Sequence, residues 1–389
     1  MVHLHGNLKQ TFRVSPRFHY DSSKQPSIDP STLTSSKHIE ESVSILLDWF
    51  EKLPTSSKSS SRSNVVCITG AGLSTESGIP DYRGFNGSYK KGHKPMIHDE
   101  FMRYEHSRQR YWGRSLAGYS YFSSREPNGG HYALTQMEHL GKIGVSISEQ
   151  KSKDGKNKTI SIITQNVDYL HQESGSNHVI ELHGRGKRLV CMHCGTHHCR
   201  HEFHEKLEYL NQNWIKNNIA MNEPISNHTN SNENGIDESN ARPDGDANLS
   251  EETDYSSIII PSCPNCNHGI LKPDVVFFGD NVPKQRVESC FDAIRAADGI
   301  LCIGSSLEVY SAYRFVKAAA KENKPIAILN IGETRAEREN HLFTIPNKEY
   351  YNMKDTNQLG TSLLTKIESP IGKTLQALVA RMRGSNFEE

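Results

Sequence analysis

The sequence of 389 residues predicts an α/β fold, in which a small domain is inserted into a doubly wound parallel sheet. Four short apolar runs, rich in β-branched residues, have the length of buried strands: 65–68, 160–163, 300–303 and 326–329. Apolar residues at helical spacing recur over 39–53, 284–297, 309–320 and 371–382. Short apolar strands that alternate with helices are typical of a parallel sheet covered on both faces. Two cysteine pairs, far apart in the sequence, mark the inserted domain.

Composition narrows the class of protein. Lysine and arginine number 45, and aspartate and glutamate also number 45, so the formal net charge is zero. A general nucleic-acid binder carries a basic excess, and we therefore expect no nucleic-acid partner. No apolar run reaches the length of about 18 residues that a spanning helix needs, so we expect no membrane segment. Eight cysteines are too few for a disulfide scaffold, and composition leaves the oligomeric state open.

The N-terminal residues have the composition of a targeting segment. Residues 1–20 contain Lys9, Arg13 and Arg17, and the first acidic residue is Asp21. A basic, Ser-rich and acid-poor start is typical of a mitochondrial presequence, which predicts a location in the mitochondrial matrix. The alternative is a disordered tail without a role, in a cytoplasmic or nuclear protein.

The remaining boundaries follow from changes in pattern. Residues 1–62 form an N-terminal extension with one helix and a Ser-rich linker, and 63–184 form the first part of the large domain. The small domain spans 185–270, and the second part of the large domain spans 271–389. Within the small domain, residues 211–257 are polar and poor in apolar residues, so we expect most of them to be a disordered insertion. The charged segment 149–158 indicates an exposed hairpin tip.

A glycine-rich turn follows the first strand. Gly70-Ala71-Gly72 comes directly after the run that begins at Val65. Glycines at such a turn let the backbone approach a pyrophosphate, as in Rossmann-like domains. The dehydrogenase fingerprint needs a third glycine where this chain has Thr75, so an ordinary hydride-transfer enzyme is disfavoured. A tight turn without a ligand is the alternative for the turn taken alone.

Further motifs accompany this turn. They are GAGLSTESGIPDYRG over 70–84, TQNVD over 164–168, LHG over 182–184 and GSS over 304–306. Taken together, they resemble the motifs of the sirtuins, the NAD-dependent protein lysine deacylases, over about residues 62–345. More narrowly, the chain resembles the class II, sirtuin-four type in RQRYW over 108–112, PDGD over 243–246, LSEE over 249–252 and LKPDVVFFGD over 271–280.

The resemblance implies a reaction and an NAD site. The reaction cleaves the bond between nicotinamide and ribose and transfers the acyl group of a modified lysine to ADP-ribose. Asn166 and Asp168 follow a predicted strand, at the edge where parallel sheets bind ligands, and they would shape the nicotinamide pocket. The whole NAD-binding set that the resemblance implies is Gly70, Ala71, Gly72, Ser74, Thr75, Ile79, Asp81, Tyr82, Arg83, Gln165, Asn166, Val167, Asp168, Gly304, Ser305, Ser306, Asn330, Ile331 and Gly332.

His183 is the candidate general base. The neutral form of a histidine can accept a proton at physiological pH, because its reference pKa lies near 6.5. The resemblance implies that His183 deprotonates the ribose hydroxyl, with Asn166 and Asp168 as the other catalytic residues. A surface or structural role is the alternative for one histidine among 20.

The cysteine pairs predict a structural zinc site. Cys191 and Cys194 form one C-x-x-C pair, and Cys263 and Cys266 form the other. Four thiolates can bind Zn²⁺ tetrahedrally with no open position, which excludes a catalytic role for the metal. The 68 residues between the pairs (195–262) exceed the spacing of a simple zinc ribbon, so the insertion must loop out. The alternatives are that the pairs are redox motifs, or that a neighbouring histidine replaces one cysteine ligand.

The substrate residues are the last prediction. By resemblance, Val276, Phe277, Phe278 and Gly279 pair with an acyl-lysine protein substrate, although an ordinary buried strand explains Val275 and Val276 equally well. Tyr111 and Arg114 have the Y-x-x-R spacing by which desuccinylating sirtuins recognise an acidic acyl group, and residues i and i+3 share a helix face. This predicts a preference for acyl groups that are longer or branched, and in some cases acidic, over acetyl. A surface arginine and a packing tyrosine are the alternative.

Two other functions remain open from the sequence. The same NAD site could transfer ADP-ribose to a protein, which would make the chain a mono-ADP-ribosyltransferase. A different class of protein is an interaction module, in which the zinc knuckles bind partners and the NAD site is vestigial.

Overall fold

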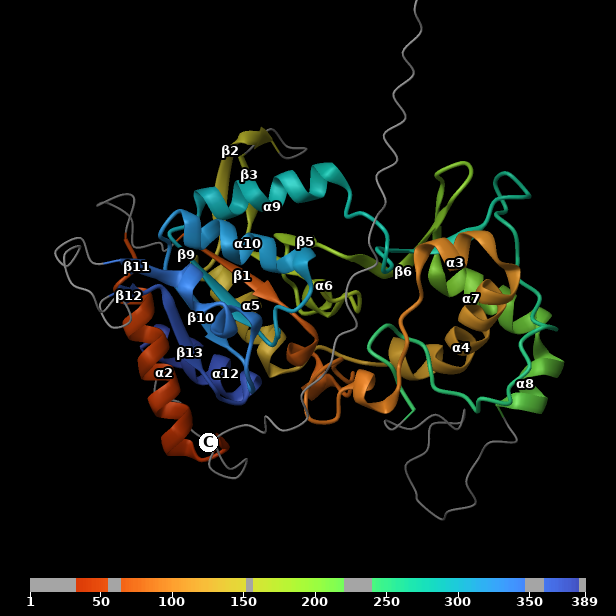
Figure 1. The fold of residues 1–389 in the computed structure, drawn as a ribbon, viewed down its shortest axis with the longest axis horizontal. Helices are drawn as coiled ribbons and strands as arrows, with labels where there is room; N and C mark the ends of the chain where they lie inside the picture. The colour runs from red at the N-terminus through yellow and green to blue at the C-terminus, as the bar shows by residue number, and fades with distance from the viewer. Residues whose placement is uncertain (1–32, 55–63, 152–156, 220–239, 347–359, 385–389) are drawn as a thin grey trace, which may run out of the picture.

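The large domain is built on a parallel sheet. This computed structural model describes residues 33–54, 64–151, 157–219, 240–346 and 360–384. The strands lie in the order β13-β10-β9-β1-β4-β5 (Figure 1), and every neighbouring pair is parallel. Their bounds are β1 Val65–Thr69, β4 Ile162–Thr164, β5 Val179–Glu181, β9 Gly299–Ile303, β10 Ile326–Leu329 and β13 Leu364–Ile367.

The central strands are apolar throughout because both faces of the sheet are covered. Every residue of β1 and β9 is buried, and Cys67 of β1 lies beside Leu301 of β9. A half-exposed strand would alternate polar and apolar residues instead. The four apolar runs of the sequence overlap β1, β4, β9 and β10, although Ile160 lies before the start of β4, and the predicted fold class is confirmed.

Helices cover the two faces of the sheet. On one face α2 (Ser36–Glu51), α5 (Gly129–His139) and α12 (Ile371–Met382) pack together (Figure 1), and their core includes Trp49 and Leu375. On the other face lie α9 (Lys284–Ala296), α10 (Tyr310–Lys321) and the hairpin of β2 (Val145–Lys151) and β3 (Asn157–Ile160). The hairpin was predicted, while residues 152–156 at its tip lie outside the described part of the chain.

The small domain, with helices α3, α4, α7 and α8 at the right of Figure 1, combines an antiparallel sheet with helices. Its antiparallel sheet has the order β7-β6-β8, with β6 Gly184–Cys191, β7 His197–Cys199 and β8 Leu271–Val275. The helices are α3 (His98–Arg103), α4 (Glu105–Ser123), α7 (Arg200–Leu210) and α8 (Gln212–Asn218). Trp112 of α4 is fully buried in the core that these elements share.

The domain boundaries differ from those expected. Strand β8 pairs with β6, so residues 271–275 belong to the small domain and not to the second part of the large sheet. Helices α3 and α4 also pack there, although they precede β4 in the sequence. Sequence periodicity could not place them, because a helix face indicates burial without naming the partner.

The insertion expected to be disordered is largely packed in the described residues. Trp214 of α8 is buried, and its indole N–H donates to the backbone carbonyl of Asp254 at 2.7 Å. Asp246 is also buried. The expectation is therefore wrong for 211–219 and 240–257, because a few aromatic and ion-pair contacts anchor a polar sequence. Residues 220–239, like the candidate presequence and most of the Ser-rich linker, lie outside the described residues.

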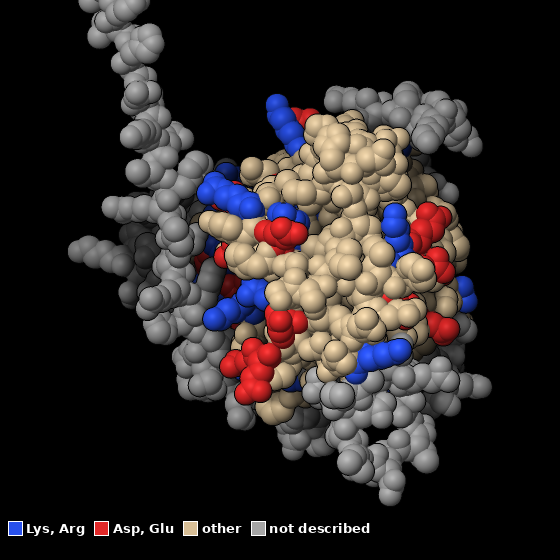
Figure 2. All heavy atoms as spheres, turned by 90° about the vertical axis from the view of Figure 1, so that its right-hand side faces the viewer, with Lys and Arg blue, Asp and Glu red and all other residues tan. Residues whose placement is uncertain are grey.

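The remaining described elements are short. They are α6 (Leu170–Glu173), α11 (Arg335–Arg338), β11 (Thr344–Pro346) and β12 (Gly360–Ser362). In the described part of the chain, no helix combines the length and the apolar character needed to cross a membrane. Figure 2 shows the small-domain end of the molecule, where acidic and basic side chains are interspersed and neither sign dominates.

Candidate active site

The glycine-rich turn is packed against a second turn of the sheet edge. A Cβ atom on Gly70 would lie 2.8 Å from the carbonyl oxygen of Gly304, and one on Gly72 would lie 2.9 Å from the same oxygen. The amide of Gly72 donates to that oxygen at 2.9 Å. Only glycine permits this approach at both positions. The structure thus brings together the loops after β1 and β9, as the motifs predicted.

Three buried polar side chains lie beside this turn. The amide nitrogen of Asn166 donates to the backbone carbonyl of Gly70 at 3.1 Å and to the Ser74 hydroxyl at 3.0 Å. The Ser74 hydroxyl donates to the Asp168 carboxylate at 2.7 Å. The other carboxylate oxygen of Asp168 accepts from the amide of Leu170 at 3.0 Å. Asn166, Ser74 and Asp168 therefore form one hydrogen-bonded set at the ends of β1 and β4.

The flanking predicted residues complete this edge. Gln165 donates to the Ser305 hydroxyl at 2.8 Å, which ties the loop after β4 to the loop after β9. Asp81 accepts from the amide of Gly84 at 2.6 Å, and Arg83 lies over the ring of Tyr89. Ile79 is buried. Thr75 is exposed, and its hydroxyl donates to the carbonyl of Gly72 at 2.9 Å. Further members of the same loops are Ala71, Tyr82, Val167 and Ser306.

His183 is held in one tautomer. Its Nδ1 lies 3.1 Å from the backbone carbonyl of Gln165, and a carbonyl can only accept, so Nδ1 carries the proton. In the neutral ring Nε2 is then an acceptor, and the Ser311 hydroxyl donates to it at 2.7 Å. Burial lowers the pKa of His183 to about 4, and Arg286 and Arg314 act in the same direction. The ring is therefore neutral at physiological pH, with Nε2 as its basic atom.

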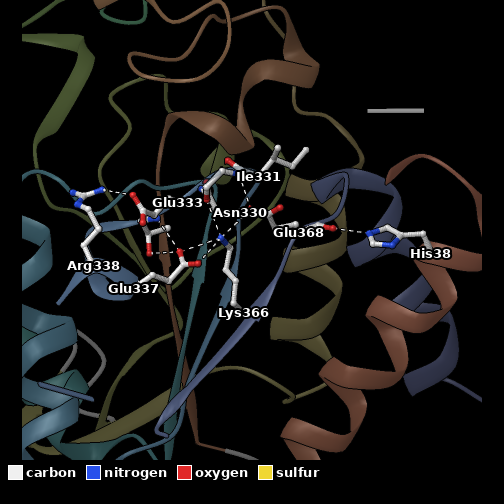
Figure 3. A network of polar contacts seen from close by, with 10 residues as sticks. His38, Asn330, Ile331, Glu333, Glu337, Arg338, Lys366 and Glu368 are labelled. Atoms are coloured by element: carbon white, nitrogen blue, oxygen red, sulfur yellow. Dashed lines mark hydrogen bonds and ion pairs between the residues drawn. The ribbon is translucent and has the colours of Figure 1, made fainter. Parts of the chain in front are cut away.

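The loop after β10 is fixed by a charged network (Figure 3). The amide nitrogen of Asn330 donates to the carbonyls of Ile331 and Gly332 at 2.9 and 3.1 Å. Lys366 of β13 donates to the same Gly332 carbonyl at 2.9 Å and pairs with the carboxylates of Glu337 and Glu368. The Glu368 carboxylate in turn accepts from the amide of Gly332 at 3.0 Å. Two strand ends thus determine the shape of this loop.

The four predicted cysteines meet in one cluster. The sulfurs of Cys191 and Cys266 lie 3.7 Å apart, and those of Cys194 and Cys263 lie 3.8 Å apart. A zinc ion at about 2.3 Å from four sulfurs at tetrahedral corners requires sulfurs about 3.8 Å apart. A Cβ on Gly269 would lie 2.2 Å from the Cys191 sulfur, so the backbone closes over the cluster. His198 lies 3.2 Å from the Cys263 sulfur as a neighbour of the four thiols.

The substrate segment forms one wall of a cavity with a volume of about 480 Å³. Val276, Phe277 and Phe278 line it, and the amide of Val276 donates to the backbone carbonyl of His183 at 2.8 Å. The carbonyl of Phe278 accepts from the amide of His98 at 2.9 Å, and Gly279 follows with a positive φ of 81°. The cavity is therefore linked to His183 through the backbone of Val276, while the His183 side chain is not one of its lining residues.

The Y-x-x-R pair is divided between two roles. Tyr111 lines the cavity, whereas Arg114 is not among the lining residues. The guanidinium of Arg114 pairs with the carboxylate of Asp246, and the side chain of Asp246 is 2% exposed. This differs from the expectation that both residues grip an acyl carboxylate. Asp246 lies in the segment 240–257, whose packed structure the sequence pattern did not predict, and Asp246 already neutralises Arg114.

Comparisons with known proteins identify the family. The Sir2 family model matches residues 70–311. The chain is 44% identical over 270 residues to "NAD-dependent protein deacetylase 2" of Bradyrhizobium diazoefficiens, which covers 69% of this chain and 85% of that protein. It is 37% identical over 337 residues to "NAD-dependent protein deacylase SRT2" of Arabidopsis thaliana, which covers 85% of this chain and 79% of that protein.

The chain belongs to the Sir2 family. Solved structures agree on the fold. A structure titled "Structural Basis for the Mechanism and Regulation of Sir2 Enzymes" covers 90% of this chain and 99% of its own, with a TM-score of 0.54 and 23% identity. Another, "The Structural basis for Sirtuin Substrate affinity", covers 88% and 98%, with a TM-score of 0.53 and 22% identity.

The residues fit the two groups that the Sir2 family implies. The Gly70–Gly72 turn packs closely against the Gly304 turn, and the polar side chains of Asn166 and Ser74 lie at the same edge, a donor set that suits a dinucleotide. The four sulfur atoms lie within 4.8 Å of one another, which fits one structural zinc ion.

Sequence reasoning missed residues that support this Sir2 site. Ser311 contacts the base, Lys366 fixes the loop after β10, and the Thr69 hydroxyl lies 2.9 Å from Nε2 of the buried His171. None of the three stands in a motif that the sequence analysis used. The position of Ser311 directly after Val309-Tyr310, at the start of a predicted helix, was the one available signal.

Proposed function

We propose that this chain is an NAD-dependent protein-lysine deacylase. The observation that carries the proposal is the position of His183. Its Nδ1–H is bonded to the carbonyl of Gln165, beside the predicted NAD residues, and its backbone carbonyl is bonded to Val276, in the predicted substrate segment. A neutral imidazole at this junction can accept a proton from a group held between the two sites.

The residues divide the work of the reaction. Bound at this edge, NAD would supply an electrophilic ribose carbon on loss of its nicotinamide, which the acyl oxygen of the modified lysine could attack. The polar side chains of Asn166, Ser74 and Asp168 are fixed by their own hydrogen bonds and need no rearrangement. This favours a strained, well-oriented pose of bound NAD. Nε2 of His183 takes the proton of the ribose hydroxyl, because its Nδ1 proton is already committed to Gln165.

The acyl group is proposed to be larger than acetyl. A cavity of about 480 Å³ extends from the substrate segment into the small domain, and an acetyl group would fill a small part of it. Its wall carries several aromatic side chains, including Tyr111 and Phe277, which suit a methylene chain.

The finer classification is part of the same proposal. The class II, sirtuin-four type is supported by the segment 243–246, because Asp246 holds Arg114 and Asp244 lines the cavity. Mitochondrial location is supported by the composition of residues 1–20 alone. Import of the full chain into isolated mitochondria, with and without residues 1–20, tests that location.

The site favours neither of the other functions that the sequence left open. A vestigial NAD site would tolerate loss of the polar set, yet Asn166, Ser74 and Asp168 are joined by hydrogen bonds, and His183 is held by the carbonyl of Gln165. Product identification separates deacylation, which yields acyl-ADP-ribose and free lysine, from ADP-ribosyl transfer, which yields a modified protein.

The test compares the full-length protein with one variant and one control. With NAD and a panel of acyl-lysine peptides, mass spectrometry should detect free lysine and acyl-ADP-ribose. His183→Ala should lose at least about 100-fold in kcat, the usual contribution of a general base. His178→Ala, which changes an exposed histidine nearby, should keep wild-type rates. Equal rates for His183→Ala and wild type would remove His183 from the mechanism.

A further inference from the structure

Lys272 is a buried lysine beside the segment that is predicted to pair with the substrate. It lies on β8, and its side chain is 4% exposed. Among the residues that the structure describes, it is the only lysine in the buried core. A lysine normally keeps its ammonium group in water, because burial of a charge is costly unless the charge is paired. We therefore expect the surroundings of Lys272 to be arranged around its charge.

The ammonium group is surrounded by acceptors. Its Nζ donates to the backbone carbonyl of Val275, and to that of Pro273 at 3.3 Å. The carboxylate of Asp280 lies 3.8 Å from the same nitrogen. The ring of Phe277 covers the group, with the ring centre 4.5 Å from Nζ, and a cation is attracted to an aromatic face. An ammonium has three N–H donors and no acceptor, so this set of partners suits a charged lysine.

These partners lie before, within and after the substrate segment, residues 276–279. The register of β8 with β6 ends at Val275, so contacts other than a regular ladder must hold the residues that follow. The segment then bends, because Gly279 has a φ of 81° and the amide of Asp280 donates to the carbonyl of Phe277 at 3.0 Å. The nitrogen of Lys272 thus joins the two ends of this bend.

Helix α3 holds the same bend from another side. His98, its first residue, donates its amide to the carbonyl of Phe278 at 2.9 Å. The ring nitrogen Nδ1 of His98 lies 3.2 Å from the carboxylate of Asp280. Ile97 pairs with Phe278 in a parallel bridge. Asp280 is therefore shared between His98 and Lys272, so α3 and β8 act on one residue.

We propose that Lys272 is a positioning residue, which holds the substrate segment in the shape that pairs with the backbone of an acyl-lysine peptide. A peptide that adds to a strand gains affinity through main-chain bonds, and a receiving backbone that is already ordered lowers the cost of binding. The charge of Lys272 contributes to peptide binding and not to the chemical step, because its polar partners lie within 273–280. This inference rests on the proposed deacylase function.

The experiment compares variants of the full-length protein. Lys272→Met removes the charge and keeps an elongated apolar side chain, and Lys272→Arg keeps the charge. Lys324→Met is the matched control, because Lys324 also donates to two backbone carbonyls, those of Ile294 and Arg295, but in the large domain. Three quantities are measured: kcat and KM for an acyl-lysine peptide, KM for NAD, and hydrogen exchange of the fragment 275–281.

Lys272→Met should raise the KM for the peptide by about 10-fold, the loss expected for a hydrogen bond to a charged group, and change kcat less than about 3-fold. The KM for NAD should stay the same. The amides of Val276 and Asp280 should exchange at least about 10-fold faster, because the backbone bonds that protect them open more often. Lys272→Arg should restore most of the peptide affinity, and Lys324→Met should match wild type in all three quantities.

Each contrary outcome has a distinct meaning. A fall in kcat with an unchanged KM for the peptide overturns the positioning role, and so does exchange of 275–281 at the wild-type rate. If Lys272→Met does not fold, Asp280→Asn decides the matter, because it removes the charge that Lys272 pairs. Its KM for the peptide should rise by about 3-fold, the loss expected for an ion pair that is partly exposed, and an unchanged KM contradicts the proposal.

The deacylase function is tested separately in the same experiment. Absence of nicotinamide release with every peptide contradicts that function. Hydrogen exchange of 275–281 needs no turnover, so it still shows whether Lys272 holds the substrate segment.

Discussion

A histidine with a low pKa is an available base over a wide pH range. Burial is the main cause of the pKa of about 4 at His183, and the bond to the Gln165 carbonyl opposes it. The reference pKa near 6.5 would leave much of the base protonated at pH 6. In this environment the neutral, proton-accepting form predominates at every pH above about 4.

The pH profile of kcat/KM tests this statement. The acidic limb of the kcat/KM profile reports the pKa of the essential base in the free enzyme. Protonation of His183 removes that base, so activity should fall only as the pH drops toward about 4. Between pH 8 and pH 5.5 this group should cause no loss. A fall in kcat/KM centred near pH 6.5 in wild type would show that His183 is not desolvated, provided that the fall is absent with a substrate that needs no base.

Ser311 is a positioning residue for the base. Its hydroxyl donates to Nε2 of His183 at 2.7 Å, which orients the ring before a ribose hydroxyl arrives. Ser311→Ala should lower kcat by about 3- to 10-fold, the range of one hydrogen bond, with little change in the KM for NAD. Ser311→Thr keeps the hydroxyl and should restore the rate. A loss that appears in KM, or that Thr does not rescue, would argue for a purely structural role.

At the scale of elements, the site depends on strand ends. The loops after β1, β4, β9 and β10 all leave the same edge of the parallel sheet, and direct bonds such as Gln165 to Ser305 join them. Lys366 shows how a neighbouring strand contributes, because it fixes the loop after β10 from β13 (Figure 3). The helix α2 also reaches this region, where His38 lies 2.6 Å from the carbonyl of Glu368.

Replacement of Lys366 tests the contribution of this network. Lys366→Met removes the donor to Gly332 and leaves the carboxylates of Glu337 and Glu368 without their shared cation. NAD binding, measured by calorimetry, should weaken by about 10-fold, equivalent to one hydrogen bond to a charged group. Lys373→Met, an exposed change on α12, serves as the control. Unchanged NAD affinity in Lys366→Met would separate this network from the cofactor site.

Sequence predicted the elements whose pattern is set by local burial. The run beginning at Val65 and the helix over 371–382 were found because a covered sheet requires apolar strands and one-sided helices. The edge strands β5 and β13 were missed, since only some of their residues are buried. The packing of 240–257 was also missed, because it depends on pairs such as Arg114 with Asp246 that are distant in the sequence.

The candidate site was also predicted only in part, because the sequence shows local motifs and not contacts between distant residues. Motif residues such as Asn166, Asp168 and the four cysteines are brought together, because local spacing and strand ends determine where they lie. Ser311 acts through its contact with His183, which is distant from it in the sequence. The place of Ser311 at the start of a predicted helix is visible in the sequence, but it does not show which residue Ser311 contacts.

At the scale of the whole molecule, the four-cysteine cluster stabilises the small domain. The four cysteines form two pairs that flank the segment 195–262 of the small domain. Two of the three tryptophans, Trp112 and Trp214, lie in that domain's core, while Trp49 lies in the large domain. A metal that joins two segments of a domain that are distant in the sequence contributes directly to its folding.

Removal of zinc should therefore unfold the small domain selectively. After complete chelation, fluorescence of Trp112 and Trp214 should shift to the red, deacylation should be lost, and part of the far-ultraviolet dichroism should remain. Cys263→Ser should reduce the bound zinc, measured by elemental analysis, whereas Cys199→Ser, an exposed cysteine outside the cluster, should not. Full activity and an unchanged melting transition after chelation would contradict a structural metal.

The most direct test of the whole account is the stoichiometry between nicotinamide and freed lysine. Purified zinc-loaded protein is given NAD and an acyl-lysine peptide, and both products are quantified in one reaction. The account predicts one nicotinamide for each lysine released, with no nicotinamide when the same peptide lacks its acyl group. Lysine release without NAD, or nicotinamide release that is independent of the acylated peptide, would contradict it.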